Sequence, residues 1–169
     1  MSRSEPSTSV HSANPDAIRL VGAGSYLVTR NSIDCGWTDA GATGINMIGQ
    51  PSPLVPEAGA VIVDNDITMS APAGTIFGPN SAAIEIRGFA GSNTVLNNRI
   101  RGSANAALTV LDQNGGMPAN TSFVSNDLTG FQGSFADIFV DAGAPNTFVI
   151  GHQGAVVDNG SGTRVVPMR

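Results

Sequence analysis

A short phrase built around an asparagine returns four times along this chain of 169 residues. Each copy places an apolar residue three positions before the asparagine and Ile or Leu two positions after it. The asparagines lie 34, 33 and 28 residues apart, at Asn31, Asn65, Asn98 and Asn126. A weaker fifth copy, at residues 148–153, has Gly151 in the place of the asparagine. A period near 30 residues is typical of repeat proteins whose successive coils stack on one another.

A second set of apolar segments lies between the asparagine phrases and shows the period-2 alternation of half-buried strands. These segments cover residues 17–20, 44–48, 83–87, 107–111 and 137–140. Loops that contain Gly and Pro separate the two sets, and no helical segment lies between them. Two strand sets that alternate at this period predict a parallel β-helix, because each coil buries its apolar face only by stacking on the next coil.

The composition also favours an all-β chain with many turns. Gly accounts for 21 of the 169 residues and only 12% of the residues are charged, whereas average proteins have about 7% Gly and about 25% charged residues. Asn, Asp, Gly, Ser and Thr favour turns, whereas Val, Ile and Phe favour strands. We predict a flexible polar tail over residues 1–15 and one β-helix domain over residues 16–169.

Stacking of the repeats predicts which of their side chains point inward. The residues three positions before the asparagine position are Val28, Ile62, Val95, Phe123 and Phe148. The residues two positions after it are Ile33, Ile67, Ile100 and Leu128. These two inward positions are five residues apart, so the chain must bend between them. Because Asn tolerates left-handed backbone and stacked Asn side chains can bond to each other, we predict a structural role for Asn31, Asn65, Asn98 and Asn126.

Two of the repeats resemble those of the pectin-lyase-like right-handed parallel β-helix superfamily, without indicating a specific member. The segments are Asn-Thr-Val-Leu-Asn-Asn-Arg-Ile-Arg-Gly at 93–102 and Asn-Thr-Ser-Phe-Val-Ser-Asn-Asp-Leu-Thr-Gly at 120–130. The resemblance covers about residues 17–169. It implies a right-handed coil, which agrees with the usual handedness of crossovers between parallel strands. The expected fold is therefore all-β, a single-stranded right-handed parallel β-helix (solenoid) of about five coils.

The resemblance implies a fold more clearly than a function, because the superfamily includes lyases, hydrolases, tailspikes, adhesins and non-catalytic members. Its hydrolases use Gly-His-Gly and Arg-x-Lys phrases, but this chain has no Lys and offers only Gly151-His152-Gln153-Gly154. Its lyases bind Ca²⁺ through clustered acidic residues beside Arg or Lys. We therefore expect no cofactor and no metal, except for Ca²⁺ if the chain is a lyase.

The segments between the asparagine phrases contain a candidate polar site. Arg87 and Asp141 are expected to stack in one column, with Glu85 close by, while Asp112 and Asp137 lie at strand ends. Solenoid proteins often place their binding sites at loops and edges of this kind. The candidate polar site consists of Glu85, Arg87, Asp112, Asp137 and Asp141.

The position directly after each asparagine is mostly charged. This candidate charge ladder consists of Asp66, Arg99, Asp127 and, in the fifth copy, His152. Residues in register on neighbouring strands lie about 5 Å apart, so opposite charges at this position would attract. Two interpretations remain open: a solvated ladder that keeps the coils in register, or carboxylates around an arginine that hold a sugar or Ca²⁺.

The position two residues before each asparagine is mostly apolar and is expected to point outward. The candidate interface consists of Val63, Leu96, Val124 and Val149. An outward apolar stripe indicates a covered surface or an interface. We expect a homo-oligomer formed through this stripe or through open coil ends, and a loop or the tail covering the stripe is the alternative.

These features favour a non-catalytic binding or structural module, either carbohydrate-binding or an assembly part of a larger surface protein. The alternative is a small carbohydrate-active enzyme, a polysaccharide lyase or a glycoside hydrolase. The net charge of −5 and the scattered Arg residues argue against nucleic acid as a partner. We expect no membrane span, since no apolar run reaches about 18 residues. No signal peptide is visible, and the resemblance alone implies an extracellular or cell-surface role.

Overall fold

The computed structural model describes residues 16–22, 24–36, 42–50, 59–71, 75, 77, 81–113, 115–152 and 154–167. Within these residues the fold is all-β, without a helix. The tail predicted at residues 1–15 lies outside the described residues. The strands pair in parallel and form three sheets, which is the arrangement of a parallel β-solenoid.

The three sheets take their strands in rotation from the chain. In spatial order, sheet A contains β1 (Asp16–Gly22), β4 (Thr43–Gly49), β7 (Ala82–Gly88), β10 (Ala106–Leu111), β13 (Ile138–Val140) and β15 (Val156–Asp158). Sheet B contains β2 (Ser25–Thr29), β5 (Gly59–Val63), β8 (Thr94–Leu96), β11 (Ser122–Val124), β14 (Phe148–Ile150) and β16 (Arg164–Val166). Sheet C contains β3 (Ser32–Gly36), β6 (Asp66–Ser70), β9 (Arg99–Ala104) and β12 (Phe131–Gly133). Both strand sets expected from the sequence are therefore confirmed.

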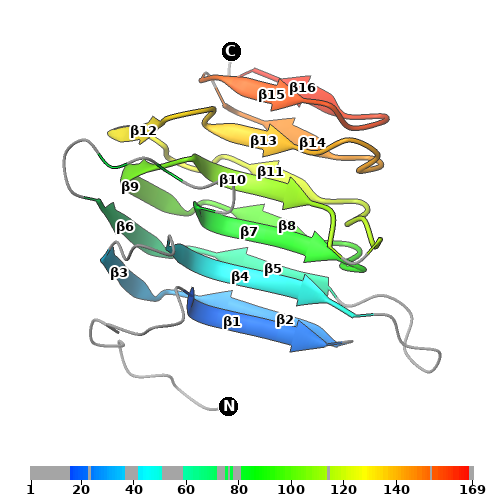
Figure 1. The fold of residues 1–169 in the computed structure, drawn as a ribbon, viewed down its shortest axis with the longest axis horizontal. Helices are drawn as coiled ribbons and strands as arrows, with labels where there is room; N and C mark the ends of the chain where they lie inside the picture. Colours follow the sequence, from blue (N-terminus) through cyan, green and yellow to red (C-terminus); the bar gives the residue numbers. More distant parts are fainter. Residues whose placement is uncertain are drawn as a thin grey trace.

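Within each sheet the strands stack along one axis, from the blue end of the chain to the red end (Figure 1). Sheet A lies in front in this view, sheet B lies behind it, and sheet C lies at the left. Sheet C ends at β12, because the chain passes from β14 to β15 without forming another strand of sheet C. The end of sheet C leaves a step in the stack, on which part of the candidate site lies.

The core lies between the sheets and is filled by alternate residues of each strand. In β7, for example, Ile84 and Ile86 are fully buried. The inward positions predicted from the repeat are confirmed for Val28, Ile62, Val95, Phe123, Ile33, Ile67 and Ile100, all buried, and Leu128 packs against them. Full burial of each large aliphatic side chain contributes about 1.5–3 kcal/mol to folding. The stacked columns therefore explain why the same apolar positions recur in each repeat.

The bend in each repeat is made by the residue before the asparagine, and not by the asparagine itself as we expected. Arg30 and Asp64 both have φ of 56°, Asn97 has 53° and Ser125 has 49°. These left-handed residues turn the chain from sheet B toward sheet C. The asparagine that follows has ordinary backbone geometry, which leaves its side chain free to bond along the stack.

The fifth copy of the phrase lies one residue further along the chain than its sequence indicated. Val149 pairs with Phe123 and is fully buried, whereas Phe148 pairs with Ser122 and is only partly buried. Gly151, with φ of 77°, therefore takes the left-handed position, which glycine adopts without steric cost. His152 takes the place of the asparagine.

Candidate functional site

The four asparagines form a hydrogen-bonded ladder through the stack. The backbone N–H and the Nδ2 of Asn65 donate to Asn98 Oδ1 at 3.0 and 2.8 Å, respectively. Asn31 donates to Asn65 Oδ1 in the same way, and Asn98 to Asn126 Oδ1. Nδ2 of Asn98 also donates to backbone carbonyls, those of Ile62 at 2.9 Å and Leu96 at 3.1 Å. These contacts occupy the polar groups of the buried side chains and hold neighbouring coils in register.

Three of the four expected members of the charge ladder lie together: Asp66 and Arg99 begin β6 and β9 of sheet C, and Asp127 lies beside Arg99. Asp66 pairs in register with Arg99, which forms an isolated bridge with Asp127. Arg99 Nε lies 3.8 Å from Asp127 Oδ2. Arg101, which the sequence argument missed, lies 3.7 Å from Asp66 and 3.9 Å from Asp127. Arg101 lies two residues after Arg99 in the same strand, so the alternation of the strand predicts that both side chains point outward.

These ion pairs are exposed and contribute little to stability. The Asp66, Arg99 and Asp127 side chains keep 51%, 56% and 48% of their surface in solvent. Exposed pairs of this kind contribute about 0–1 kcal/mol. Hydrogen bonds from the side chain and the backbone N–H of Thr129 lower the pKa of the Asp127 carboxyl. The geometry thus fits a solvated ladder that stabilises the register.

His152 does not join this ladder, because the shift in the fifth copy moves it into the asparagine column. Its Nε2 accepts a hydrogen bond from the Gly154 N–H at 3.0 Å and lies 3.6 Å from Asp137 Oδ2. Asp137 Oδ2 in turn accepts from the Ala155 N–H at 2.9 Å. Burial lowers the pKa of His152, although the Asp137 carboxylate opposes this effect. The lowered pKa favours the neutral imidazole, and the contact with Gly154 places its lone pair on Nε2.

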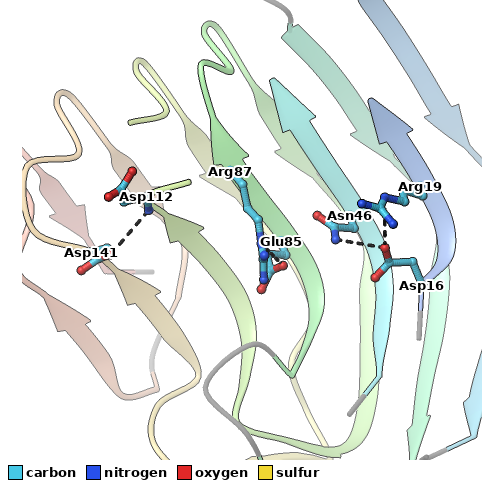
Figure 2. Close-up of polar contacts among 7 residues, drawn as sticks. All are labelled: Asp16, Arg19, Asn46, Glu85, Arg87, Asp112 and Asp141. Carbon is cyan, nitrogen blue, oxygen red and sulfur yellow. Dashed lines mark hydrogen bonds and ion pairs between the residues drawn. The ribbon is translucent and has the colours of Figure 1, made fainter. Parts of the chain in front are cut away.

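The five residues of the candidate polar site do not converge; the structure divides them into three groups. Glu85 and Arg87 form an ion pair on β7, at the centre of sheet A (Figure 2). Asp112 and Asp141 lie together at the ends of β10 and β13 (Figure 2). Asp137 precedes β13, at its opposite end, and contacts His152. Strand geometry causes this separation, since Asp137 and Asp141 flank the same extended segment.

Glu85 belongs to a buried polar row on the outer face of sheet A. Asn46, Glu85 and Thr109 are in register, and each is at most 5% exposed. Burial raises the pKa of the Glu85 carboxyl, while the hydrogen bond and charge of Arg87 act in the opposite direction. Among the described residues, no hydrogen-bond donor other than Arg87 reaches either Glu85 oxygen. Glu85 is enclosed in this structure, so it does not present its carboxylate to solvent.

Asp112 and Asp141 line a groove that the sequence argument missed. We name it the aromatic groove; it has a volume of about 500 Å³ and is lined by Phe77, Asn105, Leu111, Asp112, Phe135, Phe139 and Asp141. The rings of Phe135 and Phe139 meet edge to face, with centroids 5.3 Å apart. The Asp112 N–H contacts Asp141 Oδ2 at 3.5 Å. Phe139 could have been found from the sequence, because it alternates with the inward Ile138 and Val140 and must point outward.

A second pocket lies on the step where sheet C ends. We name it the ladder-end pocket; it has a volume of about 580 Å³ and is lined by Ser125, Asn126, Asp127, Leu128, Thr129, Asp137, Gly151, His152 and Gly154. It brings together the last asparagine of the ladder, one member of the charge ladder and the Asp137–His152 contact. The sequence placed these residues in three different groups.

The candidate interface lies on the outer face of sheet B, with one correction. Val63, Leu96 and Val124 are in register and partly buried. Val149 is not part of this face, because the shift in the fifth copy turns it into the core. Ile150 and Val166 continue the row instead, with 39% and 50% of their surface exposed. We name this row the apolar stripe.

The described residues contain no group of three or more His, Cys, Asp or Glu side chains placed to hold a metal ion. In the same part of the chain, no helix has the length and apolar character needed to cross a membrane. In comparisons with known proteins, no protein family, no curated protein and no solved structure matched the chain.

Proposed function

We propose that this chain is a non-catalytic binding module of the right-handed, pectin-lyase-like β-helix type, with about five coils, that binds neutral carbohydrate in the aromatic groove. The observation that carries the proposal is the pair of phenylalanine rings beside two carboxylates, Asp112 and Asp141. Ligand sites combine an apolar wall with a few polar groups that orient the ligand. The C–H face of a sugar ring can pack on Phe135 or Phe139, while its hydroxyls donate to the carboxylates.

Charge favours a neutral sugar over an acidic one. The chain has a net charge of −5, and the two ionisable side chains that line the aromatic groove are carboxylates. An acidic polysaccharide would place its own carboxylates against them, which costs free energy. We also propose an extracellular or cell-surface role for the chain, as part of a larger surface protein. The same proposal includes self-association through the apolar stripe.

The geometry supports binding better than catalysis. Glu85, whose pKa is raised by burial, is enclosed beside Arg87. The lone pair of His152 already accepts the Gly154 N–H, so this side chain is not free to act as a base. The second candidate function is a small carbohydrate-active enzyme that uses Asp112 and Asp141 with Arg87 nearby, and the aromatic groove is the observation in its favour.

Calorimetric titration of neutral and acidic polysaccharides tests the proposal. Phe135, which is 53% exposed, can be removed with little loss of packing. We expect Phe135→Ala to weaken the binding of neutral polysaccharide at least about tenfold, which corresponds to about 1.4 kcal/mol. The matched control is Phe89→Ala, which removes another exposed ring, 38% exposed and outside the groove.

Product analysis after long incubation separates binding from catalysis. The proposal requires that bound polysaccharide is recovered intact. Release of shorter chains by the wild type, lost in Asp112→Asn, would establish the enzyme instead. Equal binding by the wild type and Phe135→Ala would show that the aromatic groove is not the site.

A further inference from the structure

Neighbouring asparagines of the ladder contact each other in the same way at every step. In each step, a backbone N–H donates to the next Asn Oδ1 at 3.0 Å. The Nδ2 of the same residue donates to that oxygen at 2.8–2.9 Å. Two donors of one asparagine therefore always converge on a single amide oxygen that the next coil supplies.

The ladder ends at Asn126, because His152 replaces the next asparagine in the register. Nδ2 of Asn126 donates to the Val95 carbonyl at 2.9 Å, as in the other members. Among the described residues, no acceptor takes the backbone N–H of Asn126 or a second hydrogen bond from its Nδ2. The imidazole of His152 cannot take the place of the oxygen, since its lone pair on Nε2 accepts the Gly154 N–H. Both donors, which have no acceptor within the described part of the chain, belong to a residue that lines the ladder-end pocket.

The other walls of this pocket restrict what can bind. Asp127 and Asp137 place two carboxylates in it, and the lowered pKa of His152 favours its neutral form. An anion would accept from Asn126 but would be repelled by both carboxylates. Asp127 and Asp137 each accept a backbone N–H, and an ionised carboxylate has further lone pairs for ligand donors. The pocket therefore suits an uncharged group with an acceptor beside a donor.

We propose that the ladder-end pocket binds a carboxamide group, whose carbonyl oxygen takes the position that an asparagine Oδ1 takes in every other step of the ladder. The amide N–H of the ligand then donates to Asp127 or Asp137. An N-acetyl group on a sugar and an asparagine side chain of a peptide share this chemistry. The pocket is separate from the aromatic groove, so this site does not depend on the proposed carbohydrate function.

Amide-resolved NMR of the wild-type chain provides the direct test, with acetamide, N-acetylglucosamine, an asparagine-containing tripeptide, glucose and acetate as probes. We expect the first three to shift the backbone and side-chain NH resonances of Asn126, with Kd in the millimolar range. We expect glucose and acetate to leave these resonances in place. The tighter of the sugar and the tripeptide identifies the source of the amide. Shifts caused equally by glucose, or by none of the probes at saturation, would overturn the proposal.

Two substitutions at one position provide a sharper test. His152→Asn supplies an Oδ1 from the chain itself, so it should complete the ladder, raise Tm and weaken acetamide binding at least tenfold. His152→Ala removes the imidazole without supplying an oxygen, so it should bind acetamide more tightly than His152→Asn does. Loss of binding in a variant that is more stable than the wild type cannot result from unfolding. Equal acetamide affinity in His152→Asn and His152→Ala would contradict the assigned position of the carbonyl.

Discussion

Asn98 donates twice to one oxygen of Asn126, from its backbone N–H at 3.0 Å and from its Nδ2 at 2.9 Å. Asn98 Oδ1 in turn accepts two hydrogen bonds from Asn65. The side chain of Asn98 is fully buried, so each broken contact leaves a polar group without solvent to replace its partner. Asn98 is therefore, with Asn65, one of the two inner members of the ladder, and both are almost fully buried.

We expect Asn98→Ala to lower the free energy of unfolding by about 3 kcal/mol, because it strands the donors of Asn65 inside the stack. Asn31→Ala is the matched control, since Asn31 is the first member of the ladder and is only partly buried. Its loss should cost about 1 kcal/mol. Urea denaturation monitored by circular dichroism measures both values. Equal losses in the two variants would show that burial does not increase the contribution of the inner ladder contacts.

Alanine substitutions at two glycines provide a second matched comparison, because Gly102 lies in β9 of sheet C and Gly130 directly precedes β12. Gly102 has φ of 88° and Gly130 has φ of 85°, so an alanine at either position adopts left-handed backbone. A Cβ at Gly102 would also collide with the backbone of Met69 in the neighbouring strand, whereas a Cβ at Gly130 would have no described atom within 4 Å.

We expect Gly130→Ala to cost about 1 kcal/mol for the left-handed conformation alone. Gly102→Ala should cost about 3 kcal/mol or more, because the backbone of β6 or β9 must move to relieve the collision. Thermal unfolding of the two variants measures the difference. Similar Tm values would mean that β6 and β9 separate at this point at little cost.

The fold could be predicted from this sequence because the asparagine phrase recurs at a regular spacing. The left-handed residue was assigned wrongly because its chemistry differs from coil to coil. Arg30, Asp64, Asn97 and Ser125 are all polar but differ in charge and size, and glycine takes this position in the fifth copy, as Gly151. The asparagine beside it is the constant residue, and its constancy reflects side-chain bonding along the stack rather than backbone geometry.

The candidate site could be predicted only in part, because its residues meet across loops of unequal length. The spacing between repeats shortens toward the C-terminus, so the alignment of the fifth copy was one residue out. That error placed His152 in the charge ladder and Val149 on the surface. Phe135 lies between β12 and β13, where no periodicity applies, so its contact with Phe139 required the structure.

The Glu85 carboxyl makes the stability of this chain depend on pH. Its pKa is raised in the folded state above the ordinary value of 4.5, mainly by burial. The folded state therefore binds the proton more tightly than the unfolded state. The stability that this group contributes is complete below pH 4.5 and is lost as the pH rises through the raised pKa.

We expect the stability of Glu85→Gln relative to the wild type to increase as the pH rises from 4.5 upward. Thr109→Val serves as the control, because it changes a buried side chain in the same row without removing a titrating group. Its difference from the wild type should be the same at every pH. Urea denaturation across this pH range measures both differences, and parallel curves for Glu85→Gln and the wild type would contradict the raised pKa.

The apolar stripe on sheet B predicts self-association. Val63, Leu96, Val124, Ile150 and Val166 form one continuous row, and contiguous apolar surface of this kind is usually covered by a partner. A second copy would bury the row, and Leu96→Asp would place a charge within the row without changing the core.

We expect the wild type to be an oligomer in light scattering and Leu96→Asp to be a monomer with a similar Tm. The matched control is Thr68→Asp, which adds the same charge on the outer face of sheet C, in register with Arg101, and should leave the oligomer intact. A monomeric wild type, or an oligomer that survives Leu96→Asp, would exclude the stripe as the interface. Dissociation by both aspartate variants would instead attribute the effect to net charge, because only Leu96→Asp changes the stripe itself.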